Sequence, residues 1–387
     1  MARTERFGRP ARARAAGGAA VSTRRAGSAR AVARHLARRL AWAALVIVGV
    51  GTLAFLLERT LPGDPAQLLL GAQASKKDRD RAAEVYGLDA PLGEQYLLFW
   101  RRLWHRRADP ADAELPAPLR ALAGAVSIGG DAPNHQSCAT VVGAWHVDLG
   151  YSPLYRRPVA ALLAERALAS LELALAALGL QVGLGLAAGT LAARRRGSVW
   201  DRLTIGAALL GASAPVFVTG LGLQYLFAYE LGWLPYDAAS AGPTGRLAAL
   251  VLPALTLGVY GAALYARISR DEVGAALASD HARAARARGA GELRVVVVHA
   301  LRNALVPIAT LFVLELGALV GGAVVTETLF RWPGLGKLAV DALVNRDGAL
   351  TFGTVLFGAA CMVAATVVLD VLYLVLDPRL RRSARPQ

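Results

Sequence analysis

The segment from Asp280 to Pro307 holds the side chains best suited to chemistry, and that chemistry is recognition of negative charge. It reads DHARAARARGAGELRVVVVHALRNALVP and lies between two long apolar runs. Its arginines are Arg283, Arg286, Arg288, Arg294 and Arg302, with Arg270 just before them. Small alanines leave one face of a short helix thin, and Gly289 permits a sharp turn. Because guanidinium groups pair with carboxylates and phosphates, this surface is predicted to contact another protein or anionic lipid headgroups.

Composition indicates a membrane protein with several spans. Of the 387 residues, 55% are hydrophobic and 18% are charged, against about 25% charged in soluble domains. The net charge of +15 would suggest nucleic acid in a soluble protein, but the arginines cluster beside apolar runs, so no nucleic-acid partner is expected. His135, Cys138 and His146 have a spacing that fits no standard zinc site, so no bound metal is expected.

Six apolar runs are long enough to cross a bilayer as helices, which takes about 20 residues. The runs are Leu40–Leu57, Ala167–Ala193, Leu203–Phe227, Leu247–Ala266, Leu305–Thr326 and Phe352–Leu376. Segments 1–39, 194–202, 267–304 and 377–387 hold 26 of the 43 Lys and Arg residues, whereas the short opposite segments 228–246 and 327–351 hold 4. By the positive-inside rule both termini are cytoplasmic, and the long segment 58–166 is extracytoplasmic.

Three acidic residues lie inside these runs, where an unsatisfied carboxylate is costly. Glu172 and Asp370 lie near span ends, and we favour inter-helix hydrogen bonds for both. Glu315 lies deeper, and it is the candidate for a residue of a translocation pathway.

No sequence motif suggests catalysis or nucleotide binding. The segment most similar to a phosphate-binding loop is Pro333–Leu338, which contains Gly336-Lys337. The motif needs a glycine five residues before Gly336, where Arg331 stands, and Ser or Thr after Lys337, where Leu338 stands. We therefore expect no catalytic residue and no cofactor in this chain.

Several motifs resemble the permeases of peptide/nickel-type ABC importers. In that family the coupling loop runs approximately D-Y-V-R-x-A-R-A-K-G and then H-A-L-R-N-A-L-x-P, which matches Asp280–Gly289 and His299–Pro307. Further matches are Leu61–Pro65, Gly87–Leu92, and the F-x-x-P-G-L-G element from Phe330 to Gly336. The resemblance lapses over about 104–145, which indicates an external insertion that we expect to assist docking of a binding protein.

The resemblance implies an all-α membrane protein of six transmembrane helices, the type I ABC importer permease fold, in the cell (inner) membrane. It implies a five-helix core at 167–376 with a cytoplasmic coupling loop at 267–304, forming half of a path for di- or oligopeptides. The implied partners are a second homologous permease subunit, two cytosolic ATPase subunits that bind ATP and Mg, and an extracytoplasmic substrate-binding protein. The implied ATPase-coupling residues are Asp280, Arg283, Ala284, Ala285, Arg286, Ala287 and Gly289.

Two alternatives stay open on sequence alone. The same machinery could import nickel, glutathione or another small solute, because selectivity rests largely with the binding protein. A self-contained secondary transporter or channel is an alternative of another class, and it would be favoured by inverted repeats, which the sequence does not clearly show.

The arginine distribution predicts the topology. Reporter fusions at Arg196, Gly289 and Gln387 should report the cytosol, because these positions lie in or beside arginine-rich segments, and fusions at Ala117 and Asp347 should report the outside. An outside signal at Gly289 would overturn the predicted orientation.

Overall fold

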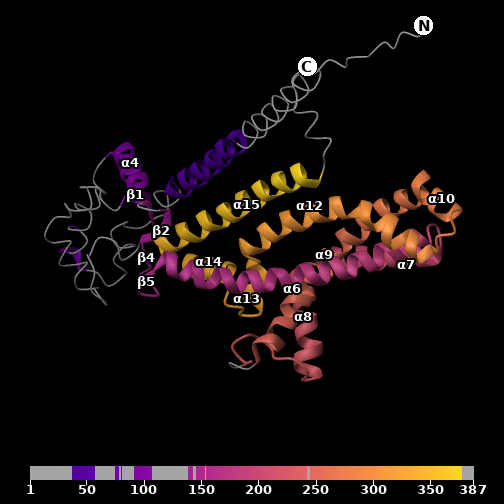
Figure 1. Ribbon diagram of the computed structural model, residues 1–387. Helices are drawn as coiled ribbons and strands as arrows, with labels where there is room; N and C mark the ends of the chain where they lie inside the picture. Colours follow the sequence, from indigo (N-terminus) through magenta and orange to yellow (C-terminus); the bar gives the residue numbers. More distant parts are fainter. Residues whose placement is uncertain are drawn as a thin grey trace, which may run out of the picture. The chain divides into compact units, whose positions relative to one another are not determined.

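The computed structural model describes residues 37–56, 75–77, 80, 91–106, 138–142, 145–152, 154–241 and 245–376 (Figure 1). Most of the predicted basic tail, the predicted tail at 377–387, the Leu61–Pro65 motif and the middle of the 104–145 block lie outside the described residues. The chain divides into two units, one of Met1–Val46 with Val367–Gln387 and one of Ile47–Thr366. The second unit contains nearly all of the described fold.

Four of the described helices are long and apolar enough to cross a membrane. They are Ala37–Leu56, α6 (Val159–Arg194), α9 (Arg246–Ala278) and α15 (Gly348–Leu376). A fifth candidate is bent by 52° between Glu292–Ala300 and Ala304–Val320, and it comprises α11 (Glu292–Arg294), η4 (Val295–Ala300) and α12 (Leu301–Val320). The predicted class of helical membrane protein is confirmed, whereas six unbroken spans are not found among the described residues.

The predicted third span, Leu203–Phe227, is wrong as a single helix. This run contains α7 (Val199–Ser213), α8 (Val216–Leu223) and the π-helix η2 (Gln224–Glu230). The break falls at Ala214, whose φ of −74° and ψ of 134° are extended. Pro215 causes it, because proline lacks an N–H donor and excludes the preceding residue from helical geometry.

Helices α6 and α9 lie in very close contact, and glycines make that contact possible (Figure 1). A Cβ at Gly185 would lie 2.3 Å from Tyr265 Cβ, and one at Gly189 would lie 2.4 Å from the Ala266 carbonyl oxygen. From the α9 side, a Cβ at Gly261 would lie 2.3 Å from the Gln181 amide. Small residues at such positions let helix backbones approach each other within a membrane.

A buried carboxylate organises the F-x-x-P-G-L-G element between α13 (Val324–Leu329) and α14 (Leu335–Val344). Glu327 is fully buried, accepts a hydrogen bond from Ser170 Oγ at 2.7 Å and accepts another from the Lys337 backbone N–H at 3.0 Å. A Cβ at Gly334 would lie 2.4 Å from this carboxylate. Glycine is therefore required there, and the turn leads directly into the short helix α14.

The first part of the second unit contains two small sheets that the sequence did not predict. Strands β1 (Trp104–Arg106), β3 (Trp145–Asp148) and β2 (Cys138–Val142) form one antiparallel sheet in that order after α4 (Leu92–Leu103). The pair β4 (Tyr151–Ser152) and β5 (Arg157–Pro158) then leads into α6. Because β1 pairs with β3, the two ends of the predicted insertion lie side by side.

The α6–α9 contact predicts different outcomes for two glycines of α6. Gly189→Ala should lower the free energy of unfolding by about 1–3 kcal/mol, because the new methyl group has no room. The matched control Gly183→Ala has no atom within 4 Å of the new methyl group, and it should be neutral or stabilising by up to about 1 kcal/mol. Thermal unfolding of the purified protein in detergent measures both, and equal melting temperatures would contradict the close contact.

Candidate coupling site

The predicted coupling residues form a short helix, α10 (Asp280–Ala287), which follows α9 after a single residue. That residue, Ser279, ends one helix and begins the other. Its hydroxyl donates to the Ala276 carbonyl oxygen at 2.6 Å and accepts from the Ala282 backbone N–H at 3.4 Å. A serine N-cap satisfies an N–H group that the first turn would otherwise leave free, so the start of α10 is fixed relative to α9.

Gly289 ends α10 with a positive φ of 83°. Its N–H donates to the Arg286 carbonyl oxygen at 2.9 Å, and the N–H of Ala290 donates to the Ala285 carbonyl oxygen at 3.1 Å. These two bonds and the packing of Ala290 beside Ala285 constitute a Schellman motif. A Cβ at Gly289 would meet no atom within 4 Å, so the requirement for glycine is conformational rather than steric.

The inner face of α10 packs against its own chain. Ala282 and Ala285 are buried with Val295, and Leu277 and Ala290 pack against them. Ala285, one of the implied coupling residues, therefore contacts its own chain in this structure. Residues three apart lie on the same face of a helix. Ala282 and Ala285 therefore share the face of α10 that α9 and η4 cover.

Arg286 also binds groups of its own chain. Its Nε donates to Glu292 Oε1 at 2.7 Å and its Nη1 donates to the Leu277 carbonyl oxygen at 3.1 Å. The hydrogen bond to Glu292 raises the pKa of Arg286, so this arginine stays charged. It ties α10 to both the end of α9 and the start of α11.

The remaining predicted residues form the exposed face of α10. Arg283 and Asp280 pair with each other, and their side chains are 71% and 90% exposed. Ala284, Ala287, Arg288 and Gly289 are exposed as well. The structure therefore separates residues that hold α10 in place from residues free to meet a partner: Asp280, Arg283, Ala284, Ala287, Arg288 and Gly289.

Two of the three acids in predicted spans pair with arginines on other helices, and the expected inter-helix hydrogen bond is found for Glu172. Glu172 on α6 pairs with Arg246, the first residue of α9, at 2.6 Å. Asp370 on α15 pairs with Arg39 at 2.9 Å.

Glu315 on α12 is different and lies apart from the coupling site. Its Oε2 atom is buried and has no hydrogen-bond partner among the described residues. It interacts with the buried side-chain hydroxyl of Tyr265 on α9.

Sequence reasoning missed the polar contacts that position α10 and its neighbours. Neither Glu292, which binds Arg286, nor the pair Asp201–Arg270 was singled out. The available signal was local, since Ser198 and Asp201 have the serine and acid spacing of a helix capping box.

Several helices of membrane length, with a short exposed helix anchored to the end of α9, define a multi-pass membrane protein. Comparisons with known proteins agree. Residues 185–382 match the family described as binding-protein-dependent transport system inner membrane component, and residues 32–123 match its N-terminal family. The chain is 34% identical over 374 residues to the di/tripeptide transport system permease protein DppB of Pseudomonas aeruginosa, covering 90% of this chain and 98% of that protein.

It is also 35% identical over 332 residues to the glutathione transport system permease protein GsiC of Escherichia coli O6:H1, covering 86% of this chain and 94% of that protein. A solved structure, the inward-facing MetNI methionine ABC transporter, aligns with 59% of this chain and 99% of the chain compared, at 18% identity and a TM-score of 0.39. That last likeness is too low to support a conclusion. The chain belongs to the family of binding-protein-dependent transport system inner membrane components, the permease subunits of ABC importers.

The Schellman motif predicts that residue 289 tolerates asparagine but not valine. Gly289→Val should strain the turn by about 1–2 kcal/mol, and amide exchange over Asp280–Ala290 should quicken by roughly 5–30-fold. Gly289→Asn should change exchange much less, because asparagine visits the left-handed region more readily.

A matched control lies in another loop, where Gly232 has a φ of 61° and also has no atom within 4 Å of an added Cβ. Gly232→Val should quicken exchange in its own loop and leave α10 unchanged. Equal exchange over α10 in Gly289→Asn and Gly289→Val would show that positive φ does not govern this turn.

Proposed function

We propose that this chain is the permease subunit of an ATP-driven importer of di- or oligopeptides and forms half of the translocation path. Family membership supports the transport role, and the relatives named for di- and tripeptide and for glutathione transport support the substrate class. Glutathione is itself a tripeptide, so import of glutathione is an alternative within the same class. Nickel or another small solute is a remaining alternative.

The exposed face of α10 is the observation that supports an ATPase contact most directly. Five of its six residues are small or basic and exposed, while Ser279, Arg286 and the Schellman motif fix the helix to α9. A partner that pulls on α10 would therefore displace α9 rather than unfold the loop. We assign ATP and Mg to two separate cytosolic ATPase subunits.

The arginine distribution supports an orientation with α10 and both termini in the cytosol. A second homologous permease subunit would complete the path, and an extracytoplasmic binding protein would deliver the substrate from the α13–α14 end. The predicted insertion at 104–145 would assist that delivery.

Glu315 is our candidate for the pathway. It is a half-buried acid in α12 whose Oε2 atom lacks a hydrogen-bond partner among the described residues, whereas Glu172 and Asp370 each pair with an arginine. A carboxylate at membrane depth is stable only if it faces water or polar groups, which Tyr265 and a transport path would provide.

Reconstitution tests the proposed function. The chain with its paired permease, ATPase subunits and binding protein is placed in liposomes, and uptake of radiolabelled dialanine and of glutathione is measured with and without ATP. ATP-dependent uptake of dialanine supports the proposal, and uptake of glutathione alone selects the alternative. Uptake driven by an ion gradient without ATPase subunits would instead indicate a secondary transporter.

Docking through α10 predicts that charge reversal at Arg283 slows association with the ATPase. Arg283→Glu should reduce the association rate of the purified ATPase with nanodisc-embedded protein by about tenfold, and the loss should shrink at high salt because exposed charges are screened. The matched control Arg346→Glu changes another exposed arginine, in the turn between α14 and α15, and should leave the rate unchanged. Equal losses in both variants would contradict docking at α10.

A further inference from the structure

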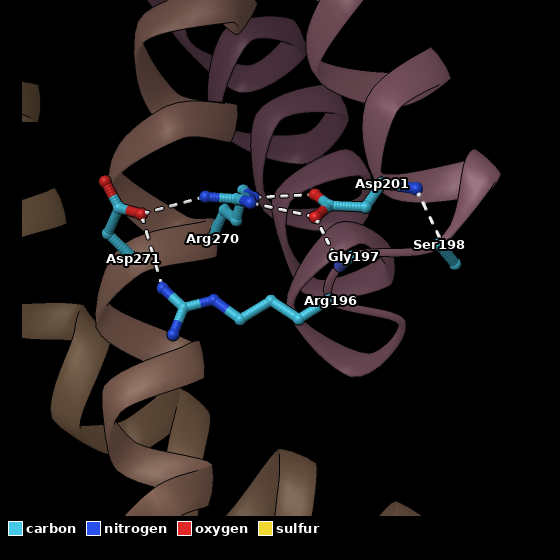
Figure 2. Close-up of polar contacts among 6 residues, drawn as sticks. All are labelled: Arg196, Gly197, Ser198, Asp201, Arg270 and Asp271. Carbon is cyan, nitrogen blue, oxygen red and sulfur yellow. Dashed lines mark hydrogen bonds and ion pairs between the residues drawn. The ribbon is translucent and has the colours of Figure 1, made fainter.

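Asp201, in the first turn of α7, and Arg270, on α9, form a buried ion pair (Figure 2). Arg270 donates from Nε to Asp201 Oδ1 at 2.6 Å and from Nη2 to Asp201 Oδ2 at 2.8 Å. The Gly197 backbone N–H donates a third hydrogen bond, to Oδ2 at 2.9 Å. Two parallel bonds from one guanidinium fix orientation as well as distance.

The pair is shielded from water, unlike the other ion pairs at this end of the fold. The Asp201 side chain is 4% exposed and the Arg270 side chain is 28% exposed. The hydrogen bonds from Arg270 and Gly197 lower the pKa of Asp201 to about 2, so the carboxylate stays ionised at physiological pH. Breaking a buried pair by removing one charge is much more costly than breaking an exposed one.

A second contact strengthens the attachment of the α6–α7 turn to α9. Arg196 approaches Asp271 at 3.6 Å (Figure 2), and its guanidinium lies over Gly274, where an added Cβ would be 2.9 Å away. The turn is therefore attached to two successive turns of α9.

Helix α7 packs against α6 and α9 largely through half-buried residues, and this ion pair is its most deeply buried contact. Among the α7 residues whose exposure the structure describes, Asp201 alone is buried. The other end of α7 is interrupted at Ala214 and Pro215, and α8 then packs against both α13 and α9, since a Cβ at Gly220 would lie 2.6 Å from Leu329 and 3.3 Å from Thr256. The ion pair thus links α9 to a broken segment that extends toward the α13–α14 element.

The same stretch of α9 leads directly to α10. Arg270 precedes the last residue of α9 by eight positions, which is about 12 Å along the helix axis. No break interrupts α9 between Arg270 and the Ser279 cap. A displacement of α10 therefore reaches Arg270 through rigid helix.

We propose that Asp201 and Arg270 are a positioning pair that makes α7 follow α9 when the ATPase moves α10. The pair does not touch substrate or nucleotide. It acts by converting movement of the coupling helix into movement of the broken segment α7–α8. The inference rests on the proposed function, because it requires an ATPase that engages α10.

The test uses the assembled transporter in liposomes with Asp201→Asn, which removes the charge and keeps the shape. Complex yield, ATP hydrolysis and uptake of radiolabelled dialanine, or of glutathione if wild type takes up only that peptide, are measured on the same preparations. We expect wild-type complex yield and continued ATP hydrolysis, with the amount of peptide imported per ATP lowered at least about tenfold. Arg270→Lys keeps the charge but loses the bidentate geometry, and it should fall between wild type and Asp201→Asn.

Glu272→Gln is the matched control, since Glu272 is an exposed acid on the same part of α9 and lies outside the attachment described above. It should keep the wild-type ratio of import to hydrolysis. An unchanged ratio in Asp201→Asn overturns the proposal, and so does loss of the assembled complex in both Asp201→Asn and Arg270→Lys, which would make the pair purely structural. If wild type itself shows no ATP-dependent uptake, the proposed function fails instead, so the two failures are distinguishable.

Discussion

The close contact between α6 and α9 is the constraint on which the rest of the fold depends. Within a bilayer, apolar side chains gain little by leaving lipid for one another, so helix association depends on tight packing and on hydrogen bonds between helices. Gly185 and Gly189 supply the packing by leaving room for Tyr265 and the α9 backbone. Gln181 supplies a hydrogen bond from its Nε2 to the Leu257 carbonyl oxygen at 3.1 Å. Helix α9 is consequently held along its length and not only at its ends.

Charged contacts complement these glycines by occupying the two ends of α9. Its first residue, Arg246, pairs with Glu172, and Arg270 near its other end pairs with Asp201. A charge is far less costly near the end of a spanning helix than at its centre, because the end lies close to water. The ion pairs therefore lie near the ends of α9, and the glycine contacts lie between them. This arrangement also makes α9 one rigid element, attached to α6 at one end and to the α6–α7 turn at the other, with α10 continuing beyond.

Sequence composition predicted the class of fold because about 20 apolar residues in a row have few alternatives to a spanning helix. It did not predict the break in the third run, although Pro215 was visible, because proline can also sit within a helix, as Pro253 does in α9. The sequence also did not show that Ala285 is buried, because helical periodicity does not say which face of α10 the residues of α9 and η4 cover. The pairing of β1 with β3 joins residues about 40 positions apart, and no local pattern specifies such a register.

The two ends of the described core differ in how much movement their packing allows. Around Glu327, glycines pack directly against backbone atoms and against the Glu327 carboxylate. A Cβ at Gly336, for example, would lie 2.7 Å from Val324 Cα. Around the α10 end, Gly197 and Gly289 have open space, and the helices are joined by hydrogen bonds and ion pairs at exposed turns. Close-packed helices transmit a displacement instead of deforming. A shift applied at α10 should therefore change the backbone conformation where helical hydrogen bonding is interrupted. Between α7 and α8 that place is Ala214–Pro215, which makes the broken run, and not the unbroken α6 and α9, the natural site of conformational change.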